Sequence, residues 1–117
     1  MTPNIRTVRF LRRHIPSFEC IPGCHDCCGP VTASSEEVAR LPIKSNAAHD
    51  AALAELNCVY LGTQGCEVYA ERPLICRVFG TTPNLACPHG KQPDVMLDPA
   101  IAQQIEQYAL DTRQVLI

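Results

Sequence analysis

The stretch CIPGCHDCCGPV, from Cys20 to Val31, places four cysteines within nine positions. The spacing Cys24-x-x-Cys27 lets a tight turn bring two sulfur atoms to one metal ion at tetrahedral angles. The neighbouring cysteines Cys27 and Cys28 point their side chains in different directions. They therefore suit two metals, two corners of a cluster, or one ligand beside a buried thiol better than a single ion.

Four further cysteines follow at wider intervals, and all eight lie between positions 20 and 87. Eight thiolates can form two four-cysteine sites, or one such site with four further thiols. Zinc and iron–sulfur clusters both take four thiolates, so spacing alone does not choose between them. The adjacent pair favours an iron–sulfur cluster slightly over zinc. We therefore predict a metal site whose ligand pool is Cys20, Cys24, Cys27, Cys28, Cys58, Cys66, Cys76 and Cys87.

Cations beside these cysteines would stabilise thiolates and a bound metal. Arg72 and Arg77 flank Cys76. Arg77 is equally well interpreted as such a stabilising cation or as an ordinary surface charge. Lys91 is interpreted as a surface charge. Among the histidines, His89 is a candidate nitrogen ligand, and His25 is expected to be exposed.

The composition predicts a modest hydrophobic core. The 117-residue chain has no Trp, three Phe and three Tyr, and much of its apolar content is Ala and Cys. Burial stabilises by roughly 25 cal/mol per Å² of apolar area, and these small residues bury little. Ten prolines and six glycines indicate short helices and long loops. The length fits one domain spanning 1–117.

The charge and hydropathy exclude several classes of partner. A formal net charge of -2 gives no general attraction for nucleic acid or an anionic membrane. No apolar run approaches the roughly 20 residues that span a bilayer. Residues 1–19 do not read as a secretory signal, so we expect the reducing cytoplasm, where dense cysteines point to metal or redox chemistry.

Periodicity predicts helices at both ends of the chain. Ile5, Val8, Leu11 and Ile15 recur at helical spacing, with an arginine stripe on another face that reads as solvated. The second helix is expected over about 98–114, with Asp98 as its N-cap and a stripe of Ile101, Ile105, Tyr108 and Val115.

Between these helices the chain alternates caps, turns and short elements. Ser34 and Glu37 have capping-box spacing, and Ser45 begins an Ala-rich helix. Residues 58–69 predict a hairpin with a turn of about four residues at 62–65. Residues 71–80 predict one or two helical turns. The expected fold is a small, mostly α, loop-rich, metal-stabilised domain with one short β-hairpin. Its cysteine-cluster region spans about 18–90.

The order of these motifs resembles the YkgJ-type cysteine-cluster proteins, also called the CxxCxxCC family. The resemblance rests on CIPGCHDCCGPV, on ERPLICRVFG at 71–80 and on CPHG at 87–90. It implies an intracellular zinc- or iron-chelating domain. All the cysteines after Cys20 match family positions, with Cys87 at the less uniform one. Three residues separate Cys20 from Cys24, where the family usually has two between its first two cysteines. Cys20 therefore matches the first family cysteine less directly.

The sequence leaves three classes of function open. The first is a metal-chelating protein that binds an iron–sulfur cluster or zinc. The second is an iron–sulfur redox protein or an accessory factor that helps to modify another protein, since a similar cluster occurs in flagellin lysine N-methylases. The third is a disulfide-rich structural module, which requires export. No catalytic residue stands out, so whether the chain is an enzyme is undecided.

Overall fold

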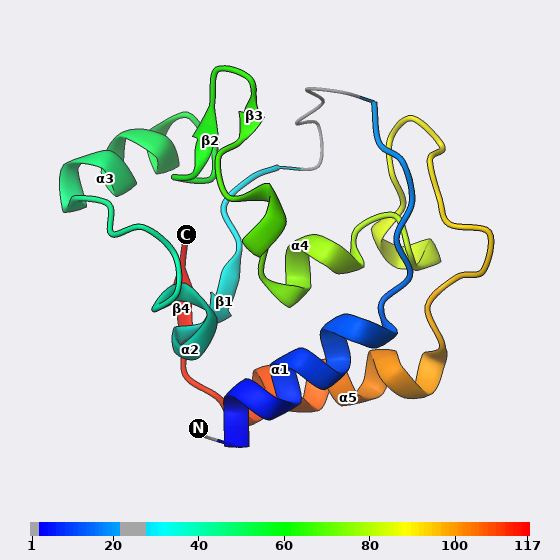
Figure 1. Cartoon of the computed structure of the whole chain (residues 1–117). Helices are drawn as coiled ribbons and strands as arrows, with labels where there is room; N and C mark the ends of the chain where they lie inside the picture. The colour runs from blue at the N-terminus through cyan, green and yellow to red at the C-terminus, as the bar shows by residue number, and fades with distance from the viewer. Residues whose placement is uncertain (1–2, 22–27) are drawn as a thin grey trace.

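The computed structural model describes residues 3–21 and 28–117. Two long helices, α1 (Pro3–His14) and α5 (Pro99–Asp111), pack side by side along one edge of the molecule (Figure 1). Helix α1 buries Ile5, Val8 and Leu11, as its periodicity predicts. Its arginine stripe, Arg6, Arg9 and Arg13, is exposed.

Helix α4 (Leu74–Val78) lies above this helix pair and connects it to the cysteine-rich part of the chain (Figure 1). It follows a 3-10 turn, η1 (Tyr69–Glu71), and Pro73 is its N-cap. The first core cluster joins α1, α4 and α5 and contains Val8, Leu11, Leu74, Val78, Leu97, Ile101 and Tyr108.

A two-stranded sheet takes up the last residues of the helix that was predicted over about 98–114. Strand β1 (Thr32–Ser34) pairs antiparallel with β4 (Gln114–Leu116), and Ala33 lies opposite Val115. The prediction that Val115 continues the helical stripe is therefore wrong. Helix α5 ends at Asp111, and Thr112 takes an extended backbone conformation that leads into β4.

Two short helices follow β1, and their predicted caps are confirmed. In α2 (Ser35–Val38) the Ser34 hydroxyl accepts a hydrogen bond from Glu37 N, and in α3 (Asn46–Ala54) the Ser45 hydroxyl accepts one from Ala48 N. The Asp98 carboxylate likewise accepts from Ala100 N at the start of α5. The second core cluster lies under these elements and contains Ala33, Leu41, Val59, Tyr60 and Ile117.

The predicted hairpin is present with a tighter turn. Strands β2 (Leu61–Gly62) and β3 (Gly65–Cys66) pair antiparallel, so two residues rather than about four form the turn. Gly65 has a φ of +105°, which glycine adopts at little steric cost. A single 3-10 turn, η2 (Pro83–Leu85), interrupts the predicted loop after α4.

A buried hydrogen-bond network links four elements at the centre of the fold. Tyr108 Oη on α5 donates to Ser34 Oγ over 2.8 Å. Ser34 Oγ in turn donates to Glu37 Oε1 over 2.9 Å. The other Glu37 oxygen accepts from Leu74 N over 2.7 Å, at the first residue of α4. Glu37 therefore fixes the start of the helix that carries Cys76.

Gly80 ends α4 in a conformation that only glycine fits easily. Its φ is +84°, and a Cβ built on it would lie 2.3 Å from Phe18 Cζ. Phe18 belongs to the segment that leads to Cys20, so this contact holds that segment against the end of α4.

We expect Gly80→Ala to destabilise the protein by about 2 kcal/mol, because it combines backbone strain with a clash against the ring. Gly90→Ala is the matched control, since Gly90 has a φ of +72° but nothing within 4 Å of the added methyl. That control should cost about 1 kcal/mol, from strain alone. Equal losses for the two variants in urea unfolding would contradict the packing role of Phe18.

The expected fold class is confirmed: the domain is small, largely helical and rich in loops, and it contains the short hairpin. No helix in the described part of the chain has the length and apolar character needed to cross a membrane.

Candidate metal centre

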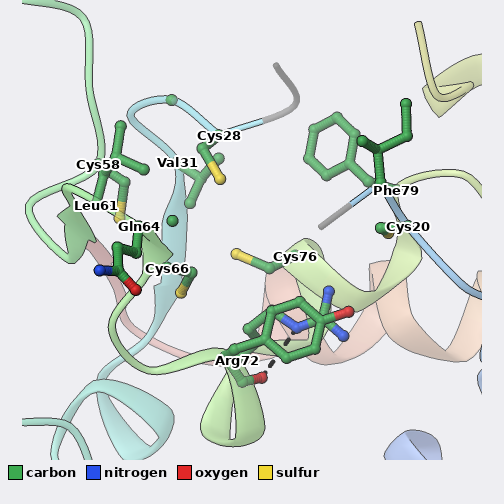
Figure 2. A pocket seen from close by; sticks show the side chains of 14 residues that line it. Cys20, Cys28, Val31, Cys58, Leu61, Gln64, Cys66, Arg72, Cys76 and Phe79 are labelled. Carbon is green, nitrogen blue, oxygen red and sulfur yellow. Dashed lines mark hydrogen bonds between the residues drawn. The ribbon is translucent and has the colours of Figure 1, made fainter. Parts of the chain in front are cut away.

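Five of the predicted ligands line one cavity of about 320 Å³. They are Cys20, Cys28, Cys58, Cys66 and Cys76. In Figure 2, Cys28, Cys58, Cys66 and Cys76 surround a common space, and Cys20 lies beyond Cys76 near Phe79. Residues that are up to 56 positions apart in sequence thus face one volume.

Each cysteine reaches the cavity from a different element. Cys58 precedes the hairpin, Cys66 is the last residue of β3, and Cys76 lies in the middle of α4. Cys28 opens the segment that leads to β1. Hairpin and helix are therefore placed so that their cysteines face the same cavity.

Of the predicted ligands that the structure describes, Cys87 does not line this cavity. Cys87 follows η2 and is absent from the described wall of the cavity. Its sulfur accepts a hydrogen bond of 3.4 Å from His89 N. Cys24 and Cys27 lie outside the described residues, as does His25.

Five of the described cysteines, Cys20, Cys58, Cys66, Cys76 and Cys87, are free thiols. Among residues 3–21 and 28–117, no three Cys, His, Asp or Glu side chains already form a group that could hold a metal ion. The described thiols therefore share a cavity without forming a closed coordination shell by themselves.

Burial makes ionisation of the central thiols unfavourable. Desolvation, followed by the nearby Cys58 and Cys66, raises the pKa of Cys76 to about 12, and Arg72 opposes this shift. Desolvation also raises the pKa of Cys58. A backbone hydrogen bond from Tyr60 lowers this pKa, and the charge of the nearby Cys66 raises it further. These groups become thiolates readily only when a cation compensates their charge.

Arg72 is the only charged side chain among the described residues that line the cavity. Its guanidinium carbon lies 3.9 Å from the centroid of the Tyr69 ring. Its Nε donates to Tyr69 O over 3.0 Å, the dashed line in Figure 2. Stacking and hydrogen bonding hold the cation in place at the edge of the thiol cavity.

Arg77 has a structural role instead. Its Nε donates to Arg72 O over 2.8 Å and its Nη2 to Ala70 O over 2.7 Å. These bonds fasten η1 to α4, and Arg77 does not contribute to the cysteine cavity. Desolvation, then repulsion from Arg12 and Arg72, lowers the pKa of Arg77. His89 and Lys91 are exposed and do not line the cavity either.

Sequence reasoning named Arg72 as a cation beside the cysteines, but it missed the parts played by Tyr69 and Glu37. Arg72 lies four residues before Cys76 and Arg77 directly follows it, so the sequence did not show that Arg72 rather than Arg77 lines the cavity. The hydrogen bond from Leu74 N to Glu37 spans 37 residues, and local spacing carries no signal for it.

The donor chemistry fits a thiophilic metal. Sulfur ligands select zinc, copper(I) and iron–sulfur clusters over hard cations such as magnesium or calcium. A metal bound by Cys28, Cys58, Cys66 and Cys76 would supply the positive charge that the desolvated thiols of Cys58 and Cys76 lack.

Comparison with known proteins supports this reading. The family described as "CxxCxxCC: Putative zinc- or iron-chelating domain" matches residues 19–108, which is most of the chain. No curated protein and no solved structure matches it.

Proposed function

This chain belongs to the CxxCxxCC family of zinc- or iron-chelating domains, and we propose that its thiolates hold an iron–sulfur cluster. One observation carries the proposal: four cysteines from separate elements, Cys28, Cys58, Cys66 and Cys76, line the same cavity. Cys20 at its far side and the family-matched Cys24 and Cys27 complete the ligand pool. Cys87, which does not line the described part of the cavity, is left out of this pool.

The adjacent cysteines in the ligand pool support a cluster over a single zinc ion. Cys27 and Cys28 suit two corners of a cluster, as the sequence indicates. The cytoplasm keeps cysteine thiols reduced, which leaves them available as metal ligands. We therefore propose that the protein is cytoplasmic.

Visible absorption, with iron and acid-labile sulfide content, tests this assignment on protein purified without oxygen. Brown protein with iron and sulfide in near-equal amounts is the expected result. Colourless protein with zinc and no sulfide would replace the cluster by a zinc site and leave chelation itself intact.

The lining of the cavity favours electron transfer as the second candidate function. Ile21, Val31, Leu61 and Phe79 share it with the cysteines, and an apolar shell of this kind tunes the reduction potential of a cluster. Voltammetry of the same sample should show a reversible transition between roughly -700 and +450 mV. A cluster without such a transition would exclude the redox role.

A further inference from the structure

A second pocket of about 210 Å³ lies beside the cysteine cavity and gathers three arginines. Arg12 comes from α1, Arg72 from the residue after η1, and Arg77 from α4. The two pockets share Cys20, Tyr69 and Arg72 as common lining. Arg72 also borders the cysteine cavity, whereas Arg12 and Arg77 line only this second pocket.

The pocket carries an excess of positive charge. Guanidinium groups stay ionised in proteins, and no carboxylate belongs to the described residues that line the pocket. Glu71 lies just outside, with Oε2 at 3.6 Å from Arg12 Nη1, and its side chain is largely exposed. Three guanidinium charges against one carboxylate leave two positive charges in excess.

One donor in this pocket lacks a partner. Arg12 Nε is buried and makes no hydrogen bond to any described residue. The Arg77 Nε and Nη2 groups bind the carbonyls of Arg72 and Ala70, and Arg72 Nε binds that of Tyr69. A buried donor without an acceptor is unfavourable in a native protein. The guanidinium of Arg12 lines the pocket while its Nε has no acceptor among the described residues, so an anion bound by this guanidinium would offset part of that cost.

We propose that this arginine pocket binds a phosphate dianion, either free or as the terminal group of an ester. Arginine forks match phosphate and carboxylate geometry alike, but two excess positive charges select the dianion. The remainder of an ester would lie next to the wall of Cys20, Tyr69 and Arg72 that separates the two pockets. This site goes beyond the proposed chelation, because phosphate binding needs no metal.

The test is calorimetric titration of the full chain with inorganic phosphate at constant ionic strength. Arg12→Gln should weaken binding about tenfold or more, because it removes a charge-assisted donor. Glu71→Gln should strengthen binding severalfold, because it removes the competing carboxylate. Arg13→Gln is the matched control, with the same charge change at an exposed neighbouring position, and should alter affinity less than about twofold.

Phenyl phosphate distinguishes the two sources of the dianion. Tighter binding than inorganic phosphate assigns the site to an ester that extends into the neighbouring cavity, and weaker binding assigns it to the free ion. The proposal would be overturned if Arg12→Gln and Arg13→Gln lost the same phosphate affinity. It would also be overturned if Glu71→Gln gained no phosphate affinity. Glu71 is exposed, so that variant tests the site even if Arg12→Gln fails to fold.

Metal content, measured on each variant, separates this inference from the proposed function. Arg12→Gln and Glu71→Gln should retain the metal of the unmodified chain. A chain that holds no metal yet binds phosphate would refute chelation and leave the arginine pocket standing.

Discussion

Replacing Cys76 by serine should abolish metal binding, with bound metal falling to about one tenth or less of that of the unmodified chain. Cys76 lies among Cys28, Cys58 and Cys66, and its thiol is the most strongly affected by burial and by these neighbours. Outer partners of metal ligands already contribute 10- to 100-fold to affinity, so loss of a ligand should cost at least about 100-fold. Metal analysis of the purified variant gives the answer.

Cys87→Ser is the informative companion to this variant. Cys87 is free and only partly exposed, like Cys76, but it does not line the cavity. We expect this variant to keep its full metal content. Loss of metal from Cys87→Ser, equal to that from Cys76→Ser, would restore the wider eight-cysteine ligand pool. Retention of metal by Cys76→Ser would refute the cavity as the metal centre.

Replacing Glu37 by alanine should destabilise the fold by about 3 kcal/mol. The two carboxylate oxygens accept from Ser34 Oγ and Leu74 N inside the protein, and hydrogen bonds to a charged group contribute about 1.5–3 kcal/mol each. Alanine leaves both donors buried without an acceptor. Because Leu74 begins the helix that carries Cys76, metal affinity should fall together with stability. Urea unfolding and metal titration measure the two effects.

Two substitutions serve as controls for the Glu37 network. Glu36→Gln alters the neighbouring carboxylate, which pairs with Arg40 at 3.7 Å near the surface, and should cost less than about 1 kcal/mol. Tyr108→Phe removes only the hydroxyl that donates to Ser34 and should cost about 1 kcal/mol. A Glu37→Ala variant no less stable than Glu36→Gln would contradict the anchoring role of Glu37.

Local sequence signals predicted the helices well. The N-caps Ser34, Ser45 and Asp98 depend on hydrogen bonds across two or three residues, so their spacing is readable directly from the chain. The pairing of β1 with β4 was not predictable in this way. It joins Thr32 to Leu116 through strands of three residues, which are too short to show alternation. Val115 was therefore assigned to the preceding helix.

The grouping of the cysteines was predictable from their density, but the choice among them was not. The family resemblance set Cys87 apart only as the less uniform match, whereas α4 directs Cys76 to the cavity and Cys87 does not line its described wall. Arg77 directly follows Cys76, yet Arg72, four residues before Cys76, is the arginine at the cavity. Only folding stacks Arg72 on Tyr69 at the cavity and uses Arg77 to bind two carbonyls.

Metal content and the response to a chelator decide whether the thiols hold this fold together. The measurement is iron and zinc per chain in protein purified without oxygen, followed by circular dichroism during chelation. We predict bound metal, and marked loss of structure on its removal, because a structural thiolate site contributes on the order of 10 kcal/mol to folding. Protein that carries neither metal, and that stays folded with chelator present, would contradict a metal-stabilised cysteine cluster.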